Sequence, residues 1–89
     1  MFNDVESLKE HLCDIGCEDA IVFDPDFAEA AIGVSDNDTV VYDYDKMVEC
    51  LVKEGMDEES AMEYIDFNAI RSLPYMGPNA PIVLRRFEE

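Results

Sequence analysis

The chain has 89 residues and carries 22 Asp and Glu residues against six Lys and Arg residues, which gives a formal net charge of −16. Because like charges repel, this charge excludes direct binding to nucleic acid or to an anionic membrane surface, and it favours a basic partner. Hydrophobic residues make up 48% of the chain, so it is expected to fold rather than remain disordered.

The N-terminal part of the chain predicts a helix followed by a strand. A helix is expected over about residues 4–15, because apolar residues recur at helical spacing and Gly16 follows as a stop signal. The apolar run at residues 20–23 predicts a buried strand. The apolar residues of the helix are Val5, Leu8, Leu12 and Ile15.

Two strands joined by a tight turn are predicted next. Residues 30–34 and 39–42 are rich in apolar, β-branched and aromatic side chains, and residues 35–38 between them are turn-forming. Together these segments predict a β-hairpin. Gly33, within the first arm, predicts either a bulge or a close packing contact.

Two further helices are expected after the hairpin. Asp43 is placed to cap the first of them, in which Glu49 and Lys53 are expected to pair one turn apart. Asp57 is placed to cap the second helix. In that helix Met62, Ile65 and Ala69 are predicted to face inward, and Glu59, Glu63 and Asp66 are predicted to align on the outer face.

The last part of the chain differs in charge from the rest. Residues 67–87 contain three arginines and no Asp or Glu, so this segment is expected to fold back and neutralise part of the acidic body. A final strand is predicted at residues 82–84. The predicted order is α-β-β-β-α-α-β, a single α+β domain over residues 1–89. We expect its helices to pack on one face of a mainly antiparallel sheet.

Several segments of the chain also carry a family resemblance. The resemblance rests on residues 31–34, 41–48, 63–68 and 73–75, together with Arg71. Over roughly residues 20–86 the chain resembles a family of short, acidic, uncharacterised proteins of gut-bacterial genomes and their prophages. That family has no established activity, so the resemblance implies a bacterial or prophage setting and no catalytic residue. One departure is Phe67, where the family pattern has a tyrosine, so no role for a phenol carries over to this position.

No motif for metal binding or catalysis is complete in the sequence. The Asp36 and Asp38 pair lacks the remaining ligands of a calcium loop. His11, Cys13 and Cys17 lack a fourth zinc ligand at a usual spacing, and the cysteines are expected to be free thiols. We therefore predict a protein without enzymatic activity, metal or cofactor. The sequence shows no signal peptide and no membrane-spanning run, so a cytoplasmic location is expected.

Two hypotheses for the function remain. In the first, an acidic face binds a basic protein surface, such as that of a nucleic-acid-binding protein, and imitates the phosphate rows of DNA. The residues expected to form this face are Asp36, Asp38, Asp43, Asp45, Glu59, Glu63 and Asp66. In the second, the chain is a small accessory or assembly module that binds a protein through an apolar patch. The residues expected to form this patch are Tyr75, Met76 and Phe87, with Phe2 as a further candidate.

Overall fold

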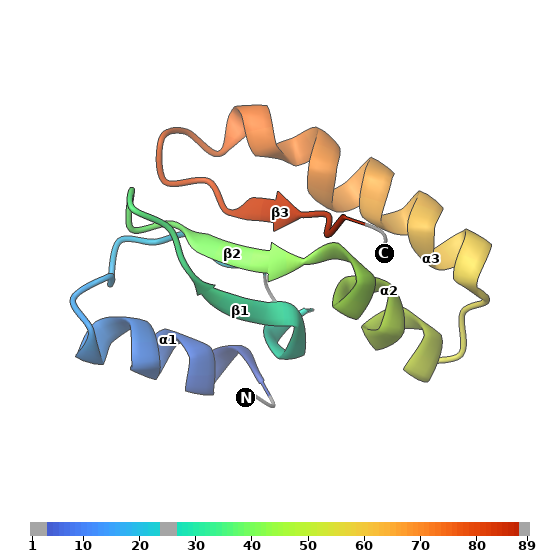
Figure 1. Ribbon diagram of the computed structural model, residues 1–89, viewed down its shortest axis with the longest axis horizontal. Coiled ribbons are helices and arrows are strands. Elements are labelled where there is room, and N and C mark those ends of the chain that lie inside the picture. Colours follow the sequence, from blue (N-terminus) through green and yellow to red (C-terminus); the bar gives the residue numbers. More distant parts are fainter. Residues whose placement is uncertain (1–3, 24–26, 88–89) are drawn as a thin grey trace.

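The computed structural model describes residues 4–23 and 27–87 of this α+β protein. Its strands are β1 (Ala31–Val34), β2 (Val40–Asp43) and β3 (Ile82–Leu84), in the order β1-β2-β3 across the sheet (Figure 1). β1 runs antiparallel to β2, whereas β3 runs parallel to it. The sheet is therefore mixed, and the prediction of a mainly antiparallel sheet holds for only one of its two strand pairs.

The β1–β2 hairpin forms where the sequence predicts it. Ser35 and Thr39 close the turn, because the N–H of Ser35 donates to the carbonyl of Thr39 at 2.8 Å and their hydroxyl oxygens lie 2.7 Å apart. Asp38 adopts a left-handed conformation (φ 59°), which Asp tolerates better than most residues. The pairing register shifts between Ala31 and Gly33, as it does at a β-bulge or another strand irregularity, whereas a Cβ atom at Gly33 would meet no atom within 4 Å, so the predicted close packing contact is not found.

The parallel pairing of β2 and β3 follows from the helical connection between them. α2 (Tyr44–Lys53) begins where β2 ends, and α3 (Glu58–Tyr64) follows after a short turn. The chain continues through a π-helical turn, η2 (Ile65–Ala69), and a 3₁₀-helix, η3 (Ile70–Tyr75), before it returns to the sheet. A strand that is reached by a helical crossover can run in the same direction as its neighbour.

The predicted N-terminal helix is confirmed as α1 (Val5–Asp14). Its N-cap is Asp4, whose side chain accepts a hydrogen bond from the backbone N–H of Ser7 at 2.9 Å. This hydrogen bond lowers the pKa of Asp4, because it stabilises the charged carboxylate. Leu8 and Leu12 are buried, as the amphipathic spacing predicts.

Residues 20–23 do not form the strand that their apolar character predicts. They have no regular secondary structure, and a short 3₁₀ turn, η1 (Ala28–Ala30), precedes β1. Phe23 is buried, and its N–H donates a hydrogen bond to the hydroxyl of Tyr42 at 3.0 Å. The segment is thus held by the burial of Phe23, by this side-chain contact and by a main-chain hydrogen bond from the N–H of Ile21 to the carbonyl of Asn79 at 3.3 Å, instead of by a strand ladder. Over the described residues the order of helices and strands is α-β-β-α-α-β.

The core is centred on Tyr42, in the middle strand, which is fully buried with its ring centre 4.8 Å from that of Phe23. Along β2, Val40 is buried and Val41 is half-buried. Ile82 pairs with Val41 in the register and is 40% exposed, so one face of the sheet is covered far more than the other. Other large side chains that are fully buried are Met47, Leu51 and Ile65.

The third helix departs from the sequence prediction in two details. Asp57 occupies the N-cap position of α3, but its side chain makes no capping hydrogen bond. The buried stripe consists of Ala61, Ile65 and Ala69, whereas Met62 is exposed. Ala61 and Ile65 lie one helical turn apart, and the π-helical turn then carries the stripe on to Ala69.

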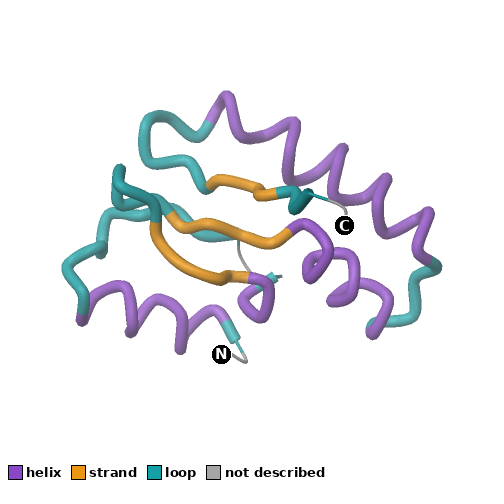
Figure 2. Tube along the Cα trace, viewed as in Figure 1, coloured by secondary structure: helices purple, strands orange, loops and turns teal. Residues whose placement is uncertain are grey.

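The helices lie around the sheet in a simple arrangement. In the view of Figure 1, α1 lies beside β1, α3 lies beside β3, and α2 leads away from the end of β2. Figure 2 shows α1 below and α3 above the strands in the same view, with most of the loops at the end away from α2. Within residues 4–23 and 27–87, no helix is long and apolar enough to cross a membrane.

Candidate functional site

The seven acidic residues predicted to form one binding face are divided among three places. Asp36 and Asp38 lie in the turn before β2, whereas Asp43 and Asp45 lie at the other end of this strand. The four residues of β2 separate these pairs by roughly 13 Å. The other three predicted residues lie on α3 and η2: Glu59, Glu63 and Asp66. The structure therefore does not bring all seven together.

Asp43 is buried and acts within the fold. Its Oδ1 atom accepts hydrogen bonds from the backbone N–H groups of Asp45 at 3.0 Å and of Lys46 at 3.4 Å, which caps α2 as predicted. Its Oδ2 atom lies 3.1 Å from Nε of Arg86, and Nη2 of the same arginine lies 3.5 Å from Oδ2 of Asp45. Both carboxylate oxygens of Asp43 therefore interact within the fold, and this buried side chain is not available to a partner protein.

Residues 67–87, which we call the acid-free segment, place their arginines against aromatic rings and carboxylates. The guanidinium of Arg85 lies 4.6 Å from the centre of the Tyr44 ring, next to the ion pairs just described. The guanidinium of Arg71 instead lies 4.4 Å from the centre of the Phe67 ring, within its own segment. The predicted return of this segment to the acidic body is thus confirmed for its C-terminal arginines and not for Arg71.

The predicted apolar patch belongs largely to the same segment. Tyr75 is 90% exposed and Phe87 is 99% exposed, whereas Met76 is half-buried and packs against the core. Phe2 lies outside the described residues. Two of the four predicted residues therefore present aromatic rings to the surface.

A groove of about 530 Å³ lies where α2, α3 and the C-terminal arginines meet. Three carboxylates line it, those of Asp45, Glu49 and Glu58, and Val48 and Met62 add apolar side chains to the lining. An arginine or lysine side chain suits such a hollow, because its stem is apolar and its head is cationic. We call this hollow the acidic groove.

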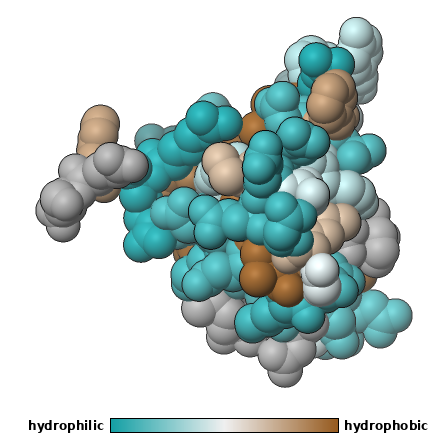
Figure 3. Space-filling view, turned by 90° about the vertical axis from the view of Figure 1, so that its right-hand side faces the viewer, coloured by the Kyte–Doolittle hydropathy of each residue, from teal (hydrophilic) through white to brown (hydrophobic). Residues whose placement is uncertain are grey.

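Exposed carboxylates continue from the acidic groove over both helices. Lys53 does not pair with Glu49 as predicted; its Nζ atom lies 3.2 Å from Oε2 of Glu29. Figure 3 shows this end of the molecule, and the face is largely hydrophilic with small apolar areas. We call the exposed carboxylates of this region the α2–α3 acidic surface: Asp45, Glu49, Glu54, Asp57, Glu58, Glu59, Glu63 and Asp66.

Two members of the acidic groove, Glu49 and Glu58, are absent from the sequence prediction. Glu49 follows Asp45 by one helical turn, so both carboxylates lie on one face of α2. The connection between α2 and α3 is short, and short connections join neighbouring antiparallel helices. The spacing of Asp45 and Glu49, together with the short connection between the helices, could have predicted that Glu58 lies beside α2.

The cysteines are free and lie in different surroundings. Cys13 is exposed, with its Sγ atom 3.7 Å from a carboxylate oxygen of Glu18. Cys17 is buried, and its Sγ atom lies 3.7 Å from Oδ1 of Asp38. Burial raises the pKa of the Cys17 thiol, and the charge of Asp38 raises it further. In the part of the chain that the structure describes, no group of three His, Cys, Asp or Glu side chains could hold a metal ion.

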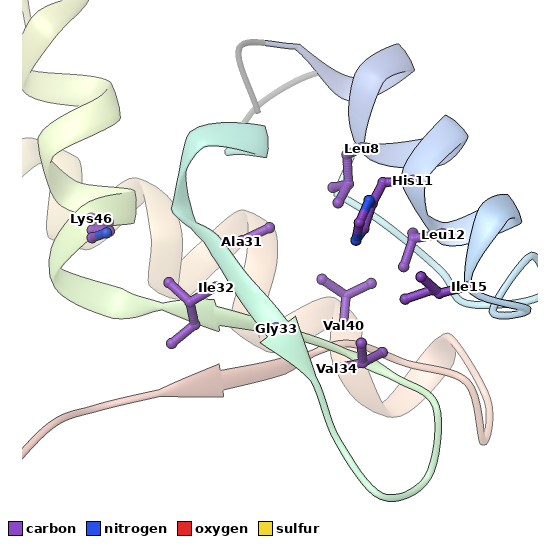
Figure 4. Close-up of a pocket in the computed structure, with 10 residues that line it drawn as sticks. All are labelled: Leu8, His11, Leu12, Ile15, Ala31, Ile32, Gly33, Val34, Val40 and Lys46. Atoms are coloured by element: carbon purple, nitrogen blue, oxygen red, sulfur yellow. The ribbon is translucent and has the colours of Figure 1, made fainter. Parts of the chain in front are cut away.

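A second groove, of about 480 Å³, lies between α1 and β1 (Figure 4). In this view Leu12 and Ile15 point from α1 toward Val34 and Val40. Sequence periodicity finds such apolar faces, but it does not tell whether a neighbouring element covers them. We call this hollow the α1–β1 groove, and it is lined by Leu8, His11, Leu12, Ile15, Ala31, Ile32, Gly33, Val34, Val40 and Lys46.

No family model, no curated protein and no solved structure matches the chain. The resemblance to acidic bacterial and prophage proteins therefore stays a prediction. Because fold alone does not determine function, the exposed surfaces of the molecule are the evidence for its function.

Proposed function

We propose that this protein is a non-enzymatic interaction module that binds the basic surface of a partner protein through the α2–α3 acidic surface. The observation that carries the proposal is the shortage of cations on this surface. Among its members, Asp45 alone has an ion pair to another described residue, and Lys53 of α2 turns away to Glu29. The other carboxylates of α2 and α3 keep their charge available to a partner.

The physical mechanism is electrostatic steering followed by many weak contacts. An exposed ion pair contributes at most about 1 kcal/mol, so affinity requires several carboxylates to act together. Clustered charges also accelerate encounter with a surface of opposite sign, and this acceleration falls as salt rises. Association through a surface of this kind is therefore expected to be fast, and its rate and affinity are expected to fall strongly as salt rises.

The chain's own C-terminus supports the choice of a cationic partner. Arg86 already lies between two carboxylates at the edge of the acidic groove, and Arg85 lies on the Tyr44 ring. Glu49 and Glu58 line the same groove as these arginines, but among residues 4–23 and 27–87 neither carboxylate forms an ion pair. A lysine or arginine of a partner can occupy this position by the same chemistry.

Imitation of DNA is a narrower version of this proposal. Duplex DNA carries one negative charge about every 1.7 Å along its axis. Carboxylates one helical turn apart, such as Glu59 and Glu63, are spaced by about 6 Å along α3. One helix therefore presents fewer charges per length than DNA, and the mimic requires α2 and α3 to act as two adjacent rows.

The proposal is tested by capture of partners from a bacterial lysate with two four-charge variants. The first variant neutralises the α2–α3 acidic surface, and the control neutralises the same number of exposed carboxylates on and after α1. The first carries Glu49→Gln, Glu58→Gln, Glu59→Gln and Glu63→Gln; the control carries Glu6→Gln, Glu10→Gln, Glu18→Gln and Asp19→Asn. We expect the first variant to lose basic partners and the control to retain them.

High salt tests whether the binding is electrostatic, and competition with duplex DNA tests whether the protein imitates DNA. At about 1 M salt, where charges are screened beyond about 3 Å, the captured partners should be released. If they bind nucleic acid and duplex DNA displaces them, the DNA-mimic version is supported. Equal loss of partners in both variants would overturn the assignment to α2 and α3.

A second candidate function is favoured by the exposed rings of Tyr75 and Phe87. An assembly module that binds through these rings should retain its partner at high salt, because apolar contact is not screened. Its partner should be lost when Tyr75→Ala and Phe87→Ala are combined. Partners that survive high salt and depend on these two rings would replace the electrostatic proposal.

A further inference from the structure

The C-terminal arginines, Arg85 and Arg86, already contact two groups that line the acidic groove. Arg85 is the first residue after β3, and its guanidinium lies 4.6 Å from the centre of the Tyr44 ring. Nη2 of Arg86 lies 3.5 Å from Oδ2 of Asp45. One aromatic ring and one carboxylate of the groove are therefore in contact with cations of the chain itself.

The contacts of these arginines differ in strength. Nε of Arg86 lies 3.1 Å from Oδ2 of Asp43, whose side chain is only 4% exposed. Separation of this pair is costly, because it would leave a buried carboxylate without its cation. Arg85 is exposed, and so is the side chain of Asp45, so the contacts that these two residues make are of the weak surface kind. The contacts with the groove can therefore open while the pair with Asp43 stays closed.

The chemistry of the contacts favours arginine over lysine. A planar guanidinium stacks on an aromatic face and offers several donors in a fixed geometry, whereas an ammonium is a compact, strongly hydrated charge. The chain uses both properties, because Arg85 lies on the Tyr44 ring and Arg86 lies between two carboxylates. The cations that occupy this groove within the fold thus indicate which cation of a partner suits it.

We propose that the C-terminal arginines form an autoinhibitory contact, so that an arginine-bearing segment of the partner enters the acidic groove only when it displaces Arg85 from the Tyr44 ring. This inference rests on the proposed binding of a basic partner to the α2–α3 acidic surface. It adds the kind of cation that the partner supplies and the group with which that cation competes.

The competition favours a segment with several arginines over a single one. A contact within one chain acts at a high effective concentration, on the order of millimolar for a short flexible tether, so one arginine of a partner competes poorly with Arg85. A longer segment also reaches Glu49 and Glu58, which form no ion pair among the described residues. These additional carboxylates offset the advantage of the chain's own arginine.

The size of the inhibition follows from the strength of the contact. The apparent affinity for a ligand falls in proportion to the fraction of molecules whose site is open. A cation–π contact at an exposed site favours the closed form by no more than about fivefold. Loss of the Arg85 side chain should therefore raise the affinity for an arginine-rich segment by about fivefold.

Two single variants, Arg85→Gln and Arg71→Gln, test this expectation. Each removes one positive charge from an aromatic ring, at 4.6 Å from the centre of Tyr44 and at 4.4 Å from the centre of Phe67 respectively. Arg71 lies outside the groove lining, so it is the matched control. The probe is a fluorescent peptide of six arginines, whose binding is followed by anisotropy at low salt. We expect its affinity to rise about fivefold in Arg85→Gln and less than about twofold in Arg71→Gln.

The side-chain Nε–Hε signals of the arginines measure the displacement in the wild-type protein, without any substitution. The protein is isotope-labelled and is titrated with the unlabelled peptide of six arginines. We expect the signal of Arg85 to shift most and that of Arg71 to remain in place. A peptide of six lysines, which has the same charge, should bind about threefold more weakly, because its ammonium groups do not stack on the Tyr44 ring.

The outcomes distinguish this inference from the proposed function. Equal affinities in the wild-type protein, Arg85→Gln and Arg71→Gln would overturn the autoinhibitory contact. If binding is then still lost in the four-charge variant of α2 and α3, the α2–α3 acidic surface remains the binding site. A lower affinity in Arg85→Gln, or an Arg85 signal that does not shift, would also overturn the contact. Absence of binding to all of these proteins would overturn both proposals.

Discussion

The α2–α3 acidic surface and the acid-free segment differ in whether their charged side chains have partners within the fold. On the acidic surface, most carboxylates have no cation beside them in the described structure. In the acid-free segment each arginine has a partner: Arg71 lies over Phe67, Arg85 over Tyr44, and Arg86 beside buried Asp43. The chain's arginines thus serve its own fold, and the carboxylates of the α2–α3 acidic surface other than Asp45 form no ion pair with them.

The largest expected effect is at Asp43, where the two regions meet. Asp43→Ala removes the cap of α2 and the buried partner of Arg86 together. A lost cap costs about 1 kcal/mol, and loss of the ion pair adds to it, so we expect the free energy of unfolding to fall by about 2 kcal/mol. Urea denaturation measures this change.

Asp45→Ala is the matched control for that experiment. Asp45 also approaches Arg86, but its side chain is exposed, so its loss should cost less than about 1 kcal/mol. If both variants lose the same stability, the link between the two regions does not depend on the buried carboxylate.

The acidic surroundings also act on a buried side chain, the thiol of Cys17. Burial and the charge of Asp38 raise the pKa of Cys17 above the ordinary value of 9.0, so its thiol stays protonated at pH 8. Exposed Cys13 should therefore react with Ellman's reagent faster than Cys17 by on the order of tenfold or more. The rates are measured separately in Cys13→Ser and Cys17→Ser.

The same pKa shift sets the sign of a pH effect. Since the folded pKa of Cys17 is raised, its contribution to stability is complete below the unfolded value near 9.0 and is lost as pH rises further. Burial also raises the pKa of Cys50, so the fall in stability above about pH 9 should be larger in the wild-type protein than in Cys17→Ser, and an equal fall in both would contradict this account. Cys17→Ser serves as the control, because it removes the titrating thiol.

The smallest expected effects have opposite signs in the two regions. Glu63→Gln relieves repulsion with Glu59 one turn away and should stabilise the protein by a few tenths of a kcal/mol at low salt. Arg71→Gln removes the cation–π contact with Phe67 and should destabilise it by about 0.5 kcal/mol. Thermal unfolding at low and high salt measures both. A gain from Glu63→Gln that persists at high salt would speak against a charge effect.

Local signals in the sequence predict much of the fold. The spacing of Leu8 and Leu12, the turn at residues 35–38 and the cap at Asp43 each depend on near neighbours, and each is confirmed. The strand predicted at residues 20–23 is absent, because an apolar run indicates burial but does not indicate whether a neighbouring strand is present. The prediction of a mainly antiparallel sheet does not hold for β3, because the direction of this strand depends on the crossover through α2 and α3.

The candidate site is harder to predict than the fold. Asp43 and Asp45 both lie at the predicted start of the second helix, yet Asp43 is buried against Arg86 and Asp45 lines the acidic groove. That distinction depends on where the C-terminal arginines return, which no local pattern specifies. The α1–β1 groove likewise lies between two correctly predicted elements. Its presence depends on how these elements pack in space, which the sequence pattern of each element does not specify.

The parallel pairing of β2 with β3 has a consequence for how the molecule assembles. Val41 meets Ile82 in this pairing, so the intervening loop must close before the last strand gains any hydrogen bond. Contacts so distant along a chain slow folding. During synthesis the hairpin can form early, but a nascent chain on the ribosome cannot complete its sheet until residues 82–84 have emerged.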